Sequence, residues 1–150
     1  MNCEINFFTE NISYVIRKKG VLRDWISKTI EQEGKTAGDI NFILCDDALL
    51  SELNYKYLKH KTLTDILTFS LDEEGDSLCG DIFISLPRVK ENATIFRERI
   101  SNELHRVMIH GILHLAGYKD ATKQEKSEMR ERESFYLDLL SQMEQPAKSV

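Results

Sequence analysis

One stretch of the chain fixes both the end of a helix and a candidate chemical site. It reads His110-Gly111-Ile112-Leu113-His114-Leu115-Ala116-Gly117-Tyr118-Lys119-Asp120. Its first half continues an amphipathic pattern that indicates a helix. Four residues of helix turn the chain by about 400°, so His110 and His114 project from the same face, one turn apart. At this spacing two histidines can bind one metal ion.

The glycine after this helix allows a third group to reach the same point. Gly117 can adopt a positive φ, which ends the helix and turns the chain back so that Asp120 approaches the histidines. The pattern H-x-x-x-H-x-x-G-x-x-D has the layout of the metzincin zinc site, with aspartate in the third position. Three protein ligands leave one coordination position for water, as hydrolytic zinc sites do. The sequence therefore predicts one metal ion, with zinc as the first choice, bound by His110, His114 and Asp120.

A simpler interpretation places two surface or core histidines on an amphipathic helix that ends at a glycine. A peptidase meets a difficulty at Gly111, because the peptidase motif H-E-x-x-H has its general base at that position. The remaining two histidines are weaker candidates. His105 lies about 140° from the ligand face, which indicates a packing or solvent residue. His60, in the basic segment Lys59-His60-Lys61, is a secondary candidate for a functional group.

The metal motif closes a long helical pattern. Pro87 suits the first turn of a helix, and apolar residues then recur every three or four positions up to Ala116, which predicts one long helix. The segment Thr122-Lys123-Gln124-Glu125 is a capping box that opens a last helix. The tail after Gln145 is expected to fray.

The first half of the chain alternates between strand and helix patterns. Residues 3–8 and 40–45 predict strands, and apolar residues at helical spacing predict a helix that ends at Gly34. Asp46 can cap a second helix, which follows it directly.

A hairpin pattern lies between these elements and the metal motif. Residues 66–71 and 79–85 predict two strands that pair antiparallel around the acidic loop 72–78. Gly80 suits a strand position where another group comes close to the backbone. Together the elements predict an α+β fold with a mixed four-stranded sheet covered by helices. The metal site is expected on the long helix and the glycine turn after it.

Length and composition limit the class of protein. The chain has 150 residues, of which 41% are hydrophobic and 30% charged, which suffices for one core but not for two ordinary domains. We expect a cytoplasmic protein without membrane contact, because no apolar run approaches the roughly 20 residues of a membrane span and no signal peptide is evident. The net charge of −5 argues against indiscriminate coating of nucleic acid. Basic residues within 88–106 alternate with glutamates, which predicts a salt-bridged helix.

Four motifs appear in a fixed order over residues 40–135. They are Leu53-Asn54-x-x-Tyr57, Thr64-Asp65-Ile66-Leu67-Thr68-Phe69, Gly80-Asp81-Ile82-x-Ile84-Ser85 and the stretch 110–120. Together they resemble the bacterial YbeY family of ribosomal RNA maturation factors. The resemblance implies a single domain over residues 1–150 and a single-strand-directed, zinc-dependent endoribonuclease that acts in 16S rRNA 3′-end maturation and ribosome quality control. It also implies one Zn2+ per chain, with rRNA and ribosomal particles as partners.

The sequence departs from this family's pattern at two positions. Asp120 stands where many members have a third histidine, and a carboxylate is an ordinary zinc ligand. Leu58 stands after Tyr57, where the family typically has an arginine. Lys59 can supply the charge but not a bidentate contact to phosphate. Lys59 and His60 are therefore the candidate RNA contacts.

Two alternatives stay open at this level. A non-catalytic ribosome assembly factor with a structural zinc would need neither the arginine nor a general base. A metallopeptidase is less favoured because of Gly111. We assign no catalytic side chain beyond the three ligands and the water that their metal would hold, and no oligomeric state.

Overall fold

The computed structural model describes residues 4–59, 64–71 and 77–145. In chain order these residues form β1 (Ile5–Thr9), α1 (Lys19–Gln32), β2 (Thr36–Cys45), α2 (Asp47–Leu58), β3 (Ile66–Ser70), β4 (Ser77–Ser85), α3 (Leu86–Phe96), α4 (Ile100–Leu115) and α5 (Lys123–Glu144). Most of the predicted loop 72–78 and the tail after Gln145 lie outside the described residues. Within the described part of the chain, no helix combines the length and the apolar character needed to cross a membrane.

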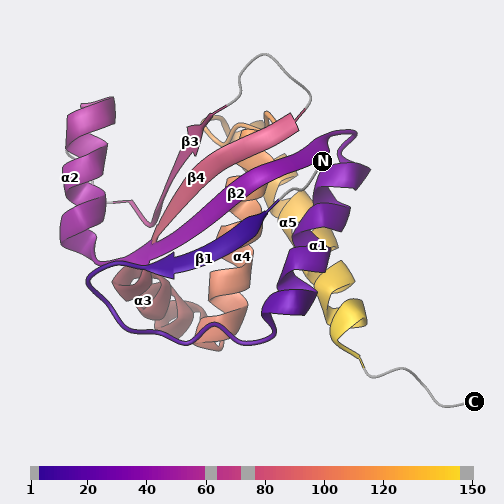
Figure 1. Ribbon diagram of the computed structural model, residues 1–150, viewed down its shortest axis with the longest axis horizontal. Helices are drawn as coiled ribbons and strands as arrows, with labels where there is room; N and C mark the ends of the chain where they lie inside the picture. Colours follow the sequence, from indigo (N-terminus) through magenta and orange to yellow (C-terminus); the bar gives the residue numbers. More distant parts are fainter. Residues whose placement is uncertain (1–3, 60–63, 72–76, 146–150) are drawn as a thin grey trace, which may run out of the picture.

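The strands form one mixed sheet in the order β1-β2-β4-β3. Strands β1, β2 and β4 run parallel, and Ile40 of β2 pairs with Ile5 on one side and Gly80 on the other. Strand β3 pairs antiparallel with β4, as the hairpin pattern predicted, with Ile66 opposite Ile84. Parallel neighbours need a crossover connection, which α1 provides between β1 and β2 (Figure 1). The predicted α+β fold with a mixed four-stranded sheet is confirmed.

Alternate residues of the two central strands build the core, because successive side chains of a strand point to opposite faces. The fully buried members are Ile40, Phe42, Leu44, Ile82 and Ile84. Helices α1, α4 and α5 pack on this face, and Figure 1 shows α4 passing behind the strands, with α1 and α5 next to each other at one end of the sheet. The indole N–H of Trp25 donates to the carbonyl oxygen of Tyr136 at 2.7 Å, which ties α1 to α5 within the core.

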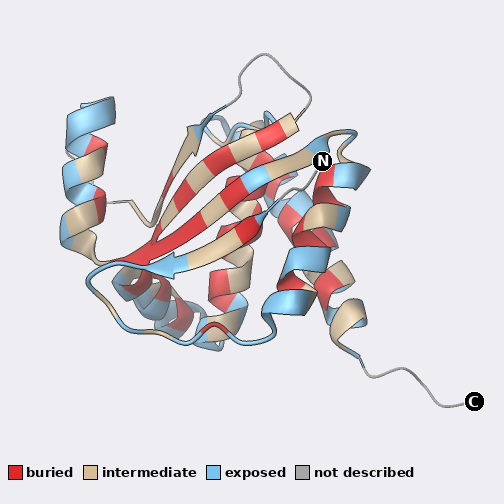
Figure 2. Cartoon of the chain, in the orientation of Figure 1, coloured by how far each residue is buried: buried red, intermediate tan, exposed pale blue. Residues whose placement is uncertain are grey.

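Helix α2 packs on the opposite face of the sheet. Its residue Leu50 forms a small cluster with Cys45 and Leu67. The carboxylate of Asp46 accepts a hydrogen bond from the N–H of Leu49 at 2.9 Å, so the predicted N-cap is confirmed. Much of α2 is exposed (Figure 2), including residues 55–59 at and just beyond its C-terminal end. This end of α2 is therefore available to solvent and to partners.

The prediction of one helix from Pro87 to Ala116 is wrong, since the segment forms two helices, α3 and α4. Arg97 has a φ of 56°, in the left-handed region, and the N–H of Glu98 donates to the carbonyl oxygen of Ala93 at 2.8 Å, which closes α3. The spacing of apolar residues does not reveal this break, because both helices bury residues at similar intervals. Neither glycine nor proline marks it, and those are the usual signals of a helix end.

Helix α4 lies close to the sheet at two glycines. A Cβ on Gly80 would lie 2.6 Å from the carbonyl oxygen of Phe69 and 3.2 Å from a side-chain carbon of Leu115, on α4. A Cβ on Gly111 would lie 2.9 Å from side-chain carbons of Ile66 and Ile82. The close approach predicted at Gly80 is confirmed, and it sets how near the helix sits to β4.

We expect Gly80→Ala to lower the free energy of unfolding by about 1–3 kcal/mol, because the added methyl group would overlap backbone that has little room to move. The urea midpoint, followed by circular dichroism, measures this change. Gly20→Ala on α1 is the matched control: nothing lies within 4 Å of its added Cβ, and alanine favours helices. Its midpoint should stay the same or rise. Equal midpoints for the two variants would show that the close contact at Gly80 does not affect the free energy of unfolding.

Candidate metal centre

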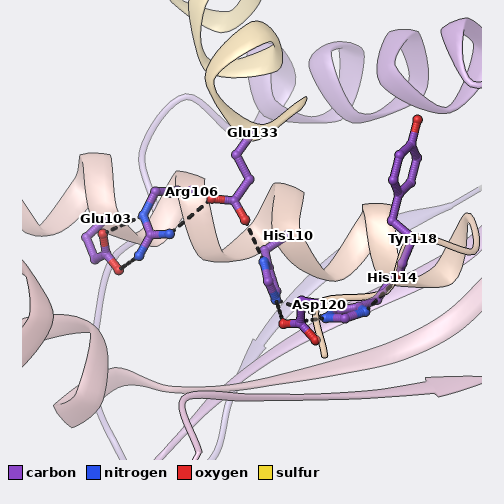
Figure 3. A network of polar contacts seen from close by, with 7 residues as sticks. All are labelled: Glu103, Arg106, His110, His114, Tyr118, Asp120 and Glu133. Atoms are coloured by element: carbon purple, nitrogen blue, oxygen red, sulfur yellow. Dashed lines mark hydrogen bonds and ion pairs between the residues drawn. The ribbon is translucent and has the colours of Figure 1, made fainter. Parts of the chain in front are cut away.

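Helix α4 and the turn after it bring three side chains together (Figure 3). The Nε2 atoms of His110 and His114, which project from one face of α4, lie 2.9 Å apart. Gly117 has a φ of 109°, so the positive φ predicted there is confirmed. After this turn, Oδ2 of Asp120 lies 3.2 Å from Nε2 of His110 and 3.4 Å from Nε2 of His114. The structure thus brings the three predicted residues to one point.

Hydrogen bonds behind the two histidines determine which ring nitrogen carries the proton. Nδ1 of His114 lies 3.0 Å from the carbonyl oxygen of Tyr118, and a carbonyl only accepts, so this nitrogen is the donor. Nδ1 of His110 lies 2.6 Å from a carboxylate oxygen of Glu133 and donates in the same way. In the neutral rings both Nε2 atoms are then acceptors, as is the carboxylate of Asp120. Three acceptors that converge in this way form a candidate site for a cation.

The geometry and chemistry of these residues fit one metal ion. Their ligand atoms all lie within 4.8 Å of one another. Zinc binds imidazole nitrogen and carboxylate oxygen at about 2.0–2.2 Å, which places ligand atoms of a tetrahedron roughly 3.3 Å apart. The separations of 2.9, 3.2 and 3.4 Å are close to this value. The side chain of Asp120 is 43% exposed, against 19% for His110, so the site is open to solvent on the aspartate side.

A chain of charged groups lies behind His110 (Figure 3). Arg106 donates to Glu133 at 3.0 Å and, through two nitrogens, to Glu103 at 2.9 and 2.6 Å. Both glutamates are buried. Burial acts to raise the pKa of Glu133, but the hydrogen bond from His110 and the charge of Arg106 hold that pKa below its usual range. Burial acts to lower the pKa of His110, but the hydrogen bond and charge of Glu133, together with the charges of Asp120 and Asp65, outweigh it and the net shift is upward.

Sequence reasoning missed Glu133, although a signal was present. Met129, Tyr136 and Leu140 form the buried stripe of α5, and Glu133 stands on it at the same helical spacing. A carboxylate on a buried face needs a partner, because an unpaired buried charge is costly. The pattern could have predicted an inward-facing carboxylate, but not which histidine it meets.

Two residues near the ligands have structural roles. Gly111 faces the sheet against Ile66 and Ile82, so a glutamate there would enter the core. The general base of the peptidase motif therefore has no room at this position. The ring of His105 lies edge-on to Trp25, with 6.2 Å between the ring centres, so of the two roles predicted, packing or solvent, the structure shows packing.

The basic residues divide into two groups. Arg88 and Arg106, on α3 and α4, form ion pairs with nearby carboxylates, which confirms the predicted salt bridges for these two residues. Lys59 follows α2 with a φ of 58°, and its Nζ lies 5.8 Å from the centre of the Tyr55 ring. Leu58 is 45% exposed beside it. His60 lies outside the described residues.

The turn between the ligands is anchored on α1. The hydroxyl of Tyr118 donates to one carboxylate oxygen of Glu33 at 2.7 Å, and the hydroxyl of Tyr136 donates to the other oxygen. Burial and the Glu33 carboxylate raise the pKa of both phenols, so both remain donors at neutral pH. Because the backbone oxygen of Tyr118 accepts from His114, Glu33 indirectly holds the second histidine.

The fold and the cluster together define an α+β protein with a candidate metal site of two histidines and one aspartate. Comparison with known families gives the particular one: the chain belongs to the YbeY family, since residues 5–141 match the family described as Endoribonuclease YbeY. The resemblance predicted from four motifs is therefore confirmed over most of the chain.

Individual relatives agree with this assignment. A Christiangramia forsetii protein named Endoribonuclease YbeY is 50% identical over 130 residues, which are 87% of this chain and 90% of the relative. The protein of the same name from Amoebophilus asiaticus is 44% identical over 133 residues, 89% and 90% of the two chains. The solution structure of TM1509 from Thermotoga maritima has a TM-score of 0.63 and 27% identity, and the match covers 98% of this chain and 99% of that one.

We expect Tyr118→Phe to lower the free energy of unfolding by about 0.5–1.5 kcal/mol, because the hydrogen bond to Glu33 is lost. Urea unfolding measures the change. Tyr57→Phe is the control, since the Tyr57 side chain is 58% exposed and loss of its hydroxyl should change stability little. A Tyr118→Phe midpoint identical to that of the control would mean that Glu33 does not anchor the turn.

Proposed function

We propose that this chain is a metal-dependent endoribonuclease that cleaves single-stranded RNA and acts in 16S rRNA 3′-end maturation and ribosome quality control. One observation carries the proposal. The acceptor atoms of His110, His114 and Asp120 converge in a chain whose relatives are named endoribonucleases. We further propose one zinc ion per chain at these residues, with rRNA and ribosomal particles as partners and the cytoplasm as compartment.

Each residue of the site has a task in this proposal. His110, His114 and Asp120 would hold the zinc ion, which when bound would supply positive charge to a phosphoryl oxygen and lower the pKa of a water molecule. His110 and His114 present Nε2 toward the ion, and the hydrogen bonds at Nδ1 hold both rings in that orientation. Asp120 brings a negative charge on the solvent side, which makes the site less Lewis-acidic than a third histidine would.

The C-terminal end of α2 offers a surface for a single RNA strand. Nζ of Lys56 lies 5.3 Å from the centre of the Tyr57 ring, and Lys59 is paired in the same way with Tyr55. Lysines attract phosphates, and aromatic rings can stack on unpaired bases. We propose Lys59, together with His60 beyond it, as RNA contacts. Lysine attracts a phosphate as a point charge and cannot form the bidentate contact of an arginine.

A second function is favoured by one observation, the presence of Leu58 where the family typically has an arginine. In this alternative the protein is a ribosome assembly factor that binds without cleaving, and its zinc is structural. A metallopeptidase is not proposed, because Gly111 packs on the sheet where a general base would have to stand.

We expect the purified wild type to contain about one zinc per chain, as a site with three protein ligands would bind. Elemental analysis of the wild type beside His110→Ala, His114→Ala and Asp120→Ala tests this expectation. Each variant should lose the metal, because two remaining ligands bind zinc weakly. Retention of zinc by Asp120→Ala would remove that residue from the ligand set, and a metal-free wild type under full metal supply would contradict the site.

We expect His114→Ala to lose cleavage of a single-stranded 16S rRNA 3′-end fragment by at least about 100-fold, because the Lewis acid is lost with its ligand. Cleavage is followed on a denaturing gel, with circular dichroism as the test of folding. His105→Gln, on another face of the same helix, is the matched control and should cleave normally. A folded His114→Ala protein that cleaves at the wild-type rate would favour the non-catalytic alternative.

A further inference from the structure

We propose that Glu133 is a positioning residue that orients His110 and thereby sets the affinity of the cluster for its metal, and that Arg106 and Glu103 hold Glu133 in place. This inference rests on the proposed metal site. It assigns a task to a helix, α5, that contributes none of the three ligands.

The first argument is the direction of the hydrogen bond. An ionised carboxylate only accepts, so a carboxylate oxygen 2.6 Å from Nδ1 of His110 requires the proton to be on Nδ1. The opposite nitrogen, Nε2, is then the one left to bind a metal, and it points at Asp120 and His114. A ring that could rotate or change tautomer would present the wrong nitrogen part of the time.

The second argument is that the carboxylate of Glu133 is itself held. One oxygen accepts from His110, and the other accepts from Nη1 of Arg106 at 3.0 Å. Arg106 in turn is fixed by a two-point contact with Glu103, at 2.9 and 2.6 Å. A guanidinium bound through two nitrogens has a defined plane. Glu103 therefore fixes Arg106, Arg106 fixes the carboxylate of Glu133, and that carboxylate orients the ring of His110.

The third argument is electrostatic. The side chains of Glu103 and Glu133 are 2% and 5% exposed, and Arg106 neutralises only one of the two charges. With Asp120 included and both histidines neutral, the group carries two negative charges, which a divalent cation balances. A buried ion pair often adds little stability over apolar residues of the same volume. A role in metal binding accounts for the excess of carboxylates at this place.

The direct test is the zinc dissociation constant of the full-length protein, measured by competition with a chromophoric chelator. We expect Glu133→Gln to weaken zinc binding by about 10–100-fold, the usual effect of removing the hydrogen-bond partner of a metal-bound histidine. Glu131→Gln, at an exposed position of the same helix, is the matched control and should bind as the wild type does. Urea unfolding of the metal-free proteins separates a change in metal affinity from a change in stability.

A spectroscopic measurement supplies a readout that a purely structural role would not move. In the zinc-loaded wild type, long-range nitrogen–proton correlation of labelled histidines should give a slowly exchanging Nδ1–H signal for His110. Glu133→Ala should lose this protection, and Glu133→Gln, which keeps an acceptor oxygen, should retain part of it. If Glu133→Ala does not fold, Glu133→Gln still carries the test.

The outcomes separate the two proposals. Equal zinc affinities for the wild type and Glu133→Gln, with or without a loss of stability, would overturn the positioning role and leave the metal site intact. A wild type that binds no zinc would overturn the metal site and this inference together. Weaker binding by Glu133→Gln with unchanged Glu131→Gln supports both.

Discussion

The close packing of α4 on the sheet is the constraint on which the rest of the site depends. A Cβ on Gly80 would overlap the carbonyl oxygen of Phe69, and one on Gly111 would overlap side chains of the sheet, so the helix packs close to the strands and has little freedom to shift or rotate. With Gly111 against the sheet, helix geometry places His110 and His114 about 60–100° to the same side. On that side they meet the returning turn at Asp120 and the inner face of α5.

Each of the three candidate ligands is then held by a different part of the molecule. His110 depends on a carboxylate from α5, and His114 depends on a backbone oxygen in a turn that rests on Glu33 near the end of α1. Asp120 depends on the positive φ of Gly117. The two interactions at Nδ1 are the ones that metal-bound histidines usually make. A site of three residues close in sequence therefore requires three helices to be docked.

The sequence predicts the helices, strands and turns that depend on local residue patterns. It does not predict features that depend on contacts between residues far apart in the chain. Apolar alternation identified the strands, and the caps at Asp46 and Thr122 gave the starts of α2 and α5. Gly117 gave the turn, because a positive φ has a recognisable residue. Arg97 also has a positive φ, but arginine does not indicate one, so the break between α3 and α4 was missed. Glu133 was missed because its role depends on how α5 docks against α4, which no spacing within α5 encodes.

The position of Glu133 in the chain has a consequence for biosynthesis. His110, His114 and Asp120 all precede α5, so a growing polypeptide contains the three candidate metal ligands before it contains Glu133, the residue proposed to orient the first of them. The Trp25 hydrogen bond to Tyr136, which helps dock α5, also waits for that last helix. The proposed centre is therefore complete only once α5 has been synthesised. Translation therefore supplies the three candidate ligands first and the residue that would orient His110 later.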